Sequence, residues 1–270
     1  MNNPIRISLK TSVTAYYMEK FQCLLDLDGI TFDQIQDSLS VIKNRNNVFN
    51  AQESQGKSGS FFFYSHDKRF IIKTLLKDES DTLIRILDSY IRHIVSSENK
   101  SLLVRIYGLF KIQSSYFANL NFILMENVAV SLDPKNLRLF TFDLKGSLSR
   151  KNELKKGKVL KCMNFVEINS SKKKLIRLDT DQIERISEIL EQDCQYLQRE
   201  GLMDYSMLLD VEQMTSQAQN AVRFDNLRRS EWKSYDYAMI YHIGIIDFLQ
   251  SWNISKKAEN YYKTKMKLTP

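Results

Sequence analysis

The chain has 270 residues, of which 43% are hydrophobic, and its 39 Lys and Arg against 32 Asp and Glu give a net charge of +7. This composition excludes collagenous, disordered and disulfide-stabilised classes, and no apolar run approaches the roughly 20 residues that a membrane-spanning helix needs. The positive surplus favours polyanionic partners such as a nucleotide, a nucleic acid or an anionic membrane surface. Cys23, Cys162 and Cys194 form no CxxC pair and no secretory leader precedes them, so we expect free thiols in a reducing compartment.

The first half of the chain predicts helices and strands around one sheet. Residues 10–45 mix apolar and polar positions at helical spacing. Residues 58–74 predict a hairpin of two strands, and residues 78–95 predict an amphipathic helix with an acidic first turn. Residues 102–109 and 122–130 predict two further strands. This order indicates a small antiparallel sheet with one helix packed on it.

The hairpin carries the strongest local signal for a ligand. A turn of small residues, Gly56-Lys57-Ser58-Gly59-Ser60, precedes an aromatic strand, and the next strand ends near Lys73. Because glycine has no Cβ, the backbone after Gly59 can approach a phosphate closely, and Lys73 can reach phosphate oxygens as a point charge. The turn also matches the end of a P-loop, but Ala51 stands where that pattern needs glycine and a strand follows where it needs a helix. A hairpin that binds no ligand stays open as an alternative.

The second half, after Pro134, predicts three strands, one long helix and two polar loops. In chain order these are a strand over 140–145, a basic loop over 150–158, a helix over 181–200 capped by Gly201, a buried strand within 203–209, a polar surface loop over 211–236 and an apolar strand over 241–247.

Two carboxylates stand at the polar ends of apolar segments. Asp204 comes just before one predicted strand and Asp247 just after another. Adjacent strands could bring both to one edge, facing Lys73 across a cleft, where one carboxylate orients a hydroxyl and the other binds Mg²⁺. Each aspartate taken alone is more often a turn or capping residue. The chain contains no HRD or DFG sequence, so an ordinary protein kinase fits poorly.

These motifs together resemble the phosphatidylinositol phosphate kinase family. The resemblance covers about residues 50–265 and is carried by the glycine turn and lysine strand, 102–109, the DLKGS sequence at 143–147, the MDYS sequence at 203–206 and the GIID sequence at 244–247. It implies an α+β, two-lobed kinase-like fold with an antiparallel sheet in the N-terminal lobe and helices and sheet mixed in the C-terminal lobe. We expect the nucleotide-clamping lobe at 1–127 and the catalytic lobe at 128–270.

The resemblance also implies a role for each site residue. Catalytic roles fall to Asp204, Lys145 and Asp143. ATP binding falls to Ser58, Gly59, Ser60, Lys73, Glu79, Met125 and Asn127, with Glu79 as an ion-pair partner of Lys73 and 125–127 beside the adenine. The inositol phosphate head group would meet Lys145, Arg150 and Lys151, although the basic residues of 150–174 can equally be a solvated face. Asp247 would hold Mg²⁺, so the expected cofactors are ATP and Mg²⁺.

The implied function is transfer of the ATP γ-phosphate to a hydroxyl of a phosphatidylinositol monophosphate. The expected partners are a phosphoinositide lipid and an anionic membrane surface, with no nucleic acid and with a homodimer as one assembly to test. The expected location is the cytoplasm, peripheral at the cytosolic face of membranes. The alternatives are a catalytically weak or silent kinase-like module that binds nucleotide or phosphoinositide, and a soluble inositol phosphate or protein kinase.

The sequence departs from the family pattern at three places. Cys162 follows Leu160-Lys161 where an acidic residue is common, and Asp210 follows Leu208-Leu209 where glycine is common. The chain ends at Pro270, close to where the family's substrate-specificity loop begins. From this last departure we expect poor discrimination among phosphoinositides and weak phosphorylation or none.

Overall fold

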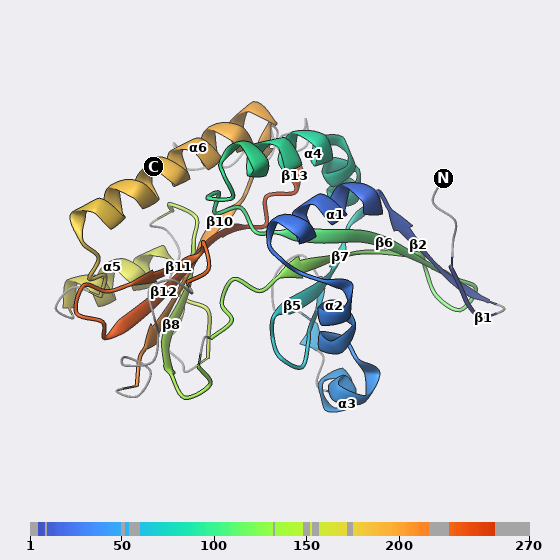
Figure 1. Ribbon diagram of the computed structural model, residues 1–270, viewed down its shortest axis with the longest axis horizontal. Helices are drawn as coiled ribbons and strands as arrows, with labels where there is room; N and C mark the ends of the chain where they lie inside the picture. The colour runs from blue at the N-terminus through green and yellow to red at the C-terminus, as the bar shows by residue number, and fades with distance from the viewer. Residues whose placement is uncertain are drawn as a thin grey trace, which may run out of the picture.

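The computed structural model describes residues 5–8, 10–49, 52–53, 60–131, 133–147, 152, 157–171, 175–215 and 227–251. In Figure 1 the described elements form two sheets side by side, with helices α4 and α6 running along the top of the molecule. All strand pairs of the two larger sheets are antiparallel. This confirms the α+β class.

The first sheet has seven strands in the order β1-β2-β6-β7-β5-β4-β3. Their bounds are β1 Ile5–Ser8, β2 Thr11–Tyr16, β3 Gln52–Glu53, β4 Phe61–Tyr64, β5 Phe70–Leu75, β6 Ile106–Ser114 and β7 Leu120–Glu126. The expected hairpin is confirmed as β4 and β5, which pair with Phe62 opposite Lys73. Apolar residues of β5 are buried from Phe70 to Leu75, so this strand is fixed from both ends.

Four helices accompany this sheet. They are α1 Met18–Leu27, α2 Phe32–Ser38, α3 Val41–Phe49 and α4 Lys77–Ser96. Helix α4 confirms the predicted amphipathic helix, because Leu83, Ile86, Leu87, Tyr90 and Ile94 at helical spacing are all buried. The helical interpretation of residues 10–45 is wrong at its start, where β2 pairs with β6; Thr14 is buried and the other residues of β2 are half-buried.

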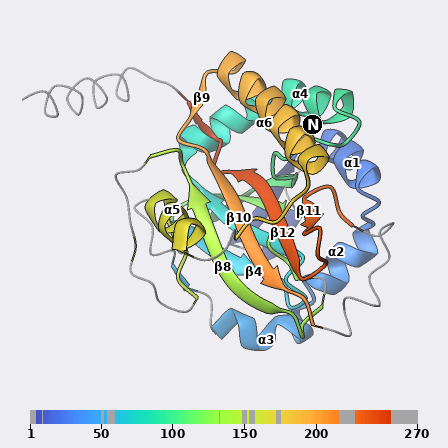
Figure 2. The same ribbon diagram turned by 90° about the vertical axis from the view of Figure 1, so that its left-hand side faces the viewer.

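The second sheet has the order β11-β12-β10-β8, which Figure 2 shows face-on. Its strands are β8 Leu137–Leu144, β10 Ser206–Gln213, β11 Glu231–Lys233 and β12 Met239–Ile246. The helices of this half are α5 Cys162–Ser171 and α6 Thr180–Arg199. A separate two-stranded sheet is formed by β9 Leu202–Met203 and β13 Gln250–Ser251. Gly201 follows α6 at φ +66°, as expected for a C-terminal glycine cap.

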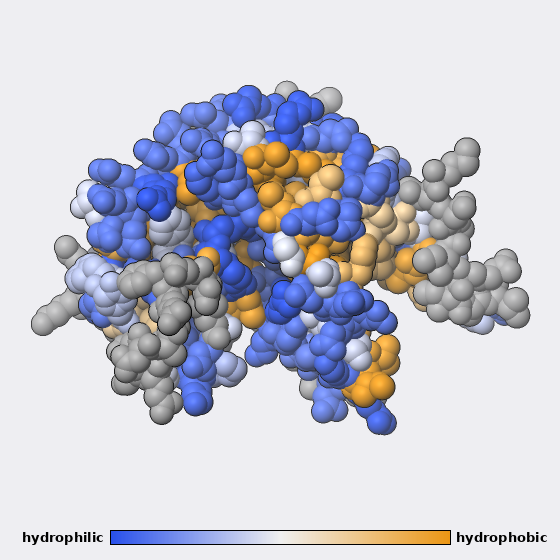
Figure 3. Space-filling view, in the orientation of Figure 1, coloured by the Kyte–Doolittle hydropathy of each residue, from blue (hydrophilic) through white to orange (hydrophobic). Residues whose placement is uncertain are grey.

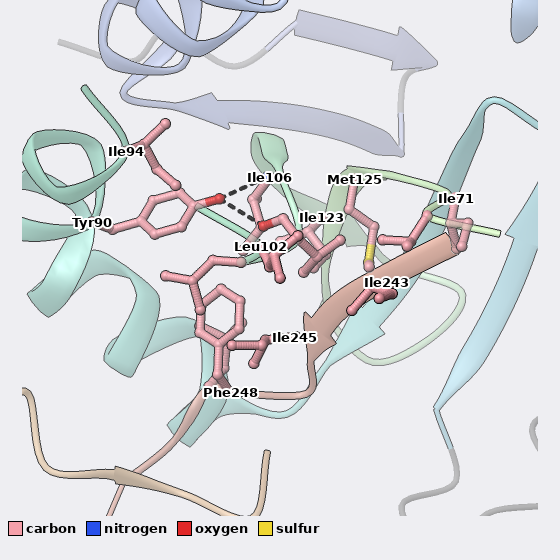
Figure 4. Close-up of a cluster of buried hydrophobic side chains, with 14 of the residues drawn as sticks. Ile71, Tyr90, Ile94, Leu102, Ile106, Ile123, Met125, Ile243, Ile245 and Phe248 are labelled. Atoms are coloured by element: carbon pink, nitrogen blue, oxygen red, sulfur yellow. Dashed lines mark hydrogen bonds between the residues drawn. The ribbon is translucent and has the colours of Figure 1, made fainter. Parts of the chain in front are cut away.

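One hydrophobic core joins the two sheets. The segment before β6 hydrogen-bonds to β12, with Val104 N–H donating to the Ile245 carbonyl at 2.9 Å and Ile245 N–H donating to the Leu102 carbonyl at 2.7 Å. Figure 4 shows side chains of both sheets in one cluster, where the Tyr90 hydroxyl is bonded to backbone beside β6. The chain passes from the first sheet to the second between β7 and β8. The proposed domain limits of 1–127 and 128–270 stay a prediction.

Two predicted segments need correction, and one helix was missed. Residues 102–105 are not a strand of the first sheet, because they are buried against β12 and β6 begins at Ile106. Residues 211–236 are not simply a surface loop, because β10 continues to Gln213 and all of β11 is buried. Helix α5 was not predicted, although it lies directly after the basic loop.

The visible surface in Figure 3 is mainly hydrophilic, with apolar atoms gathered near the middle and over α3 at the lower right. Val41 and Ile42 on α3 are both exposed. Among the described residues, no helix combines the length and the apolar character that a membrane crossing requires.

Candidate active site between the two sheets

An ion pair between the two sheets forms the centre of the site. Lys73 Nζ on β5 lies 2.7 Å from Asp247 Oδ1, which directly follows β12. The lysine side chain is 10% exposed and also faces the Phe62 ring, whereas the carboxylate is 46% exposed. The pair therefore confirms the predicted juxtaposition of Lys73 and Asp247 and presents a carboxylate to solvent.

Both predicted aspartates lie at a break between two strand ladders. β10 pairs with β12 as far as Ser206 opposite Ile246, and β9 pairs with β13 from Met203 opposite Gln250. Between these ladders Asp204 has φ +60° and Asp247 has φ +59°. Left-handed backbone is uncommon for residues other than glycine, although aspartate tolerates it better than most. The two interrupted strands thus carry two carboxylates in the same short gap.

Lys145 fixes the backbone on the Asp204 side of the gap. Its Nζ donates to the backbone carbonyl of Asp204, and its own N–H points to Cys162 Sγ at 3.3 Å. Lys145 follows β8, and Gly146 continues the chain at φ +72°. The side chain therefore bridges from the end of β8 to the turn before β10.

Asp143 is paired with a lysine that the sequence analysis did not select. Its carboxylate makes an ion pair with Lys161 Nζ, while its second oxygen, Oδ1, is buried and makes no hydrogen bond with a described residue. Backbone bonds from Asp143 N–H to the Leu160 carbonyl and from Leu160 N–H to the Thr141 carbonyl, both 2.8 Å, hold the two segments together. The Leu160-Lys161 sequence, directly before Cys162, is the signal in the sequence that points to this lysine.

A family profile described as phosphatidylinositol-4-phosphate 5-kinase matches residues 43–235 and 216–269 of the chain. The chain belongs to the phosphatidylinositol phosphate kinase family.

Relatives of known name agree with this membership. The chain is 34% identical over 198 residues to a probable phosphatidylinositol phosphate kinase of Dictyostelium discoideum, covering 73% of this chain and 27% of that protein. It is 37% identical over 177 residues to phosphatidylinositol 4-phosphate 5-kinase 9 of Arabidopsis thaliana, covering 64% of this chain and 20% of the relative. Human phosphatidylinositol 4-phosphate 5-kinase type-1 beta is 33% identical over 162 residues, covering 58% and 28% respectively. The chain therefore spans well under half the length of these relatives.

Glu79 does not pair with Lys73 in this member of the kinase family. Its Oε2 accepts the backbone N–H of Leu76 at 2.8 Å at the start of α4, while Lys73 binds Asp247. A carboxylate in the first turn of a helix is favoured by the free N–H groups and the helix dipole. The expected Lys73–Glu79 ion pair is thus replaced by the Lys73–Asp247 pair.

The segment expected beside adenine is held by its own hydrogen bonds. Asn127 Nδ2 donates to the Lys68 carbonyl at 2.8 Å, and its Oδ1 accepts the Ala129 N–H at 3.2 Å. Met125 is buried on β7. Ser60, also buried, lies directly before β4. Roles of these residues in nucleotide binding stay predictions, and Ser58, Gly59, Arg150 and Lys151 lie outside the described residues.

A buried charge cluster behind this segment was missed in the sequence. The Glu126 carboxylate accepts the Arg105 N–H at 2.7 Å and pairs with Arg229, which also donates to the Ser101 carbonyl at 2.9 Å. Burial favours the neutral acid, but Arg229 and Arg105 outweigh it and lower the pKa of Glu126 below its usual value. Because Arg229 comes from the second half of the chain, no local pattern could have connected it to Glu126.

Proposed function

We propose that this chain is an ATP-dependent kinase that transfers the γ-phosphate to a hydroxyl of a phosphatidylinositol monophosphate. The observation that carries the proposal is the Lys73–Asp247 pair at 2.7 Å, placed beside the strand break that also holds Asp204. A cation for phosphate, a carboxylate for a metal and a second carboxylate for the nucleophile are the groups that phosphoryl transfer requires.

Asp247 fits a Mg²⁺ ligand because its carboxylate is close to half exposed and, within the described part of the chain, forms its ion pair with Lys73. Mg²⁺ is usually held by one or two carboxylates together with water and nucleotide phosphates, and it would supply charge neutralisation there. Lys73 would hold phosphate oxygens of the nucleotide, and Asp247 would hold the metal. The ion pair thus keeps both groups in position between turnovers.

Asp204 is proposed to accept the proton of the lipid hydroxyl. The hydroxyl oxygen forms the new bond to the γ-phosphorus, the bond from that phosphorus to the bridging oxygen breaks, and ADP carries away the electron pair. Lys145 positions Asp204 through its backbone carbonyl. Asp143 lies on β8 opposite Leu208 of β10, and its ion-pair partner Lys161, directly before α5, is proposed to attract the lipid phosphate.

The proposed partners are a phosphoinositide lipid and the anionic cytosolic face of a membrane, to which a chain of net charge +7 would bind peripherally. The family membership supports the lipid substrate.

A radiolabelled ATP assay tests the proposal with three acceptors: phosphatidylinositol monophosphate vesicles, soluble inositol phosphates and a general protein substrate. We expect label in the lipid, its loss in Lys73→Met and Asp247→Asn, and its retention in the matched control Lys77→Met, an exposed lysine at the start of α4. Label only in the soluble or protein acceptor would contradict the lipid assignment. Lipid binding without any transfer would instead indicate a kinase-like binding module.

A further inference from the structure

A set of buried acidic and histidine side chains lies on the four-stranded sheet, away from the Lys73–Asp247 pair. In the strand register, Asp210 on β10 is opposite His242 on β12, and His242 is opposite Glu231 on β11. Glu212 is two residues beyond Asp210, so all four side chains share one face of the sheet. Each is at least 95% buried.

The histidine is directed at this set without forming a hydrogen bond. His242 Nε2 lies 3.6 Å from Glu212 Oε2, and Nδ1 lies 3.7 Å from Glu231 Oε1. Both separations exceed normal hydrogen-bond lengths, and neither nitrogen has another hydrogen-bond partner among the described residues. An imidazole that is 0% exposed and unpartnered at both nitrogens is costly unless something else binds it.

The spacing suits a metal ion better than a proton shared between these groups. One ligand atom each from Asp210, Glu212 and His242 can be chosen so that all lie within 4.8 Å of one another. Around a tetrahedral ion with bonds of about 2.1 Å, neighbouring ligand atoms are separated by about 3.4 Å. The 3.6 Å between Nε2 and Oε2 is close to that separation.

We propose that Asp210, Glu212 and His242 form a binding site for one divalent transition-metal ion, with Zn²⁺ as the best match. Zn²⁺ accepts both imidazole nitrogen and carboxylate oxygen as ligands, whereas Mg²⁺ and Ca²⁺ prefer oxygen alone. Glu231 lies on the opposite side of the ring, with Oε1 3.7 Å from Nδ1, where a carboxylate commonly stands behind a metal-binding histidine.

Positive side chains surround the three carboxylates and would compete with the ion. Arg138 donates to Asp210 Oδ2 at 2.9 Å and to Glu212 Oε1 at 3.1 Å, and its side chain is 45% exposed. Arg228 pairs with Glu231, and Lys233 follows Glu231 on the same face of β11. The Arg138 side chain therefore borders solvent, and an entering ion would compete with it for the two carboxylates.

The site would fasten the segment that joins the two sheets. Ser131 Oγ donates to Glu212 Oε2 at 2.6 Å, Arg138 donates to the Ala129 carbonyl, and Arg228 donates to the Val130 carbonyl at 2.8 Å. An ion at this position therefore stabilises the connection between β7 and β8 and has no part in the phosphoryl transfer itself.

The test uses the full chain, stripped with a chelator and titrated with Zn²⁺. Calorimetry, metal analysis after gel filtration and thermal unfolding should show one equivalent bound and a raised Tm, with no such effect of Mg²⁺. Substitution with Co²⁺ should give the visible absorption of a tetrahedral ion.

Variants separate a metal site from a network of salt bridges. Glu212→Gln should abolish uptake, and Glu231→Gln should weaken it roughly 10- to 100-fold, as for other residues behind metal ligands. Arg138→Gln should strengthen uptake because a competing cation is removed, whereas a salt-bridge network predicts destabilisation that Zn²⁺ does not reverse.

Cys23→Ser and His66→Gln are controls for binding by thiols or other histidines, and Asp247→Asn is the control for a metal bound at the proposed kinase site. All three variants should retain uptake.

The proposal is overturned if the wild-type chain takes up no stoichiometric Zn²⁺, or if Glu212→Gln binds it as well as wild type. It is also overturned if added Zn²⁺ leaves Tm unchanged while Tm varies with pH in the wild type and not in Glu212→Gln. In that case a bound proton, not a metal ion, would stabilise the cluster. His242→Gln adds a further test if it folds, and Glu212→Gln with Arg138→Gln decides the matter if it does not.

Discussion

The Lys73 side chain combines a stem on a buried strand with a charged end that pairs with a partly exposed carboxylate. Its stem lies on a buried strand, its ammonium pairs with Asp247, and the Phe62 ring lies 5.6 Å from Nζ. Removing the ammonium leaves Asp247 unpaired, but that carboxylate is 46% exposed and water can solvate it. The exposure of Asp247 therefore predicts that loss of the Lys73 ammonium costs little stability, and the proposed role of Lys73 predicts a larger effect on nucleotide binding.

Lys73→Met should weaken Mg-ATP binding by about 10- to 150-fold, the equivalent of a charged hydrogen bond worth roughly 1.5–3 kcal/mol, while the unfolding transition changes little. Calorimetric titration of Mg-ATP and a denaturant melt measure the two effects. Lys77→Met is the matched control and should bind as wild type. Equal affinity in Lys73→Met would show that this lysine does not contact phosphate.

Asp204 and Asp247 have the same backbone conformation but different proposed roles. As a metal ligand, Asp247→Asn should raise the Mg²⁺ concentration needed for half-maximal turnover. Asp204→Asn should instead lower kcat with little change in that concentration, because it removes a group that acts on the lipid hydroxyl. Magnesium titrations of lipid phosphorylation compare the variants. Superimposable titration midpoints would rule out this division of roles.

At the scale of elements, predictions succeeded where the signal was local. The spacing of Leu83, Ile86 and Leu87 was enough to define α4, and the polar end of an apolar run was enough to single out Asp247. Both depend on neighbours in the sequence. The Lys73–Asp247 contact, between residues 174 positions apart, followed from placing the ends of two predicted strands at one sheet edge, and the family resemblance supported the same placement.

The failures involve charged side chains whose pairing partners hydropathy does not reveal. Glu231 and Lys233 made 211–236 resemble a surface loop, but β11 is buried because Glu231 pairs with Arg228 and lies opposite His242. Glu79 was expected to face Lys73, but the nearer N–H of Leu76 captured it. Hydropathy alone assigns such residues to solvent, so only three-dimensional pairing reveals them.

The Glu126–Arg229 pair connects the end of β7 to the segment before β11. Arg229→Met should destabilise the protein by about 3–5 kcal/mol, because it leaves a buried carboxylate without its main partner. The double variant Glu126→Gln/Arg229→Met should recover part of this loss, whereas additive losses in a denaturant-melt cycle would show no coupling.

Acidification should remove the same contribution in the wild type. The pKa of Glu126 is lower in the folded protein than its usual value of about 4.3, so the folded state binds fewer protons than the unfolded state. The stabilisation is therefore complete above about pH 4.3 and is lost as the pH falls through the lower folded pKa. Glu126→Gln should flatten the acid limb of stability against pH, and an unchanged limb would contradict the assignment.

At the scale of the whole molecule, one hydrophobic core extends across both sheets, and its contacts hold the backbone on which Asp247 lies. Ile245 on β12 bonds to the segment before β6, and Phe248, just after Asp247, packs on Tyr90 of α4 with ring centroids 5.8 Å apart. Gly244 is needed on β12 because a Cβ there would come within 2.8 Å of Val128. The backbone around Asp247 is thus held from both sides, which keeps its carboxylate facing Lys73.

The net charge of +7 predicts reversible, salt-dependent binding to anionic vesicles. Each basic residue near such a surface contributes about 1 kcal/mol, screened over roughly 8–10 Å at physiological salt. Flotation with phosphoinositide-containing vesicles should therefore recover the chain at low salt and lose it at high salt, and neutral vesicles should not recover it.

Lys158→Ala, an exposed position near α5, should weaken vesicle binding about 5-fold, while Lys111→Ala on β6 serves as a control in the other sheet. Salt-independent binding, or equal recovery with neutral vesicles, would show that the charge does not direct the protein to a membrane.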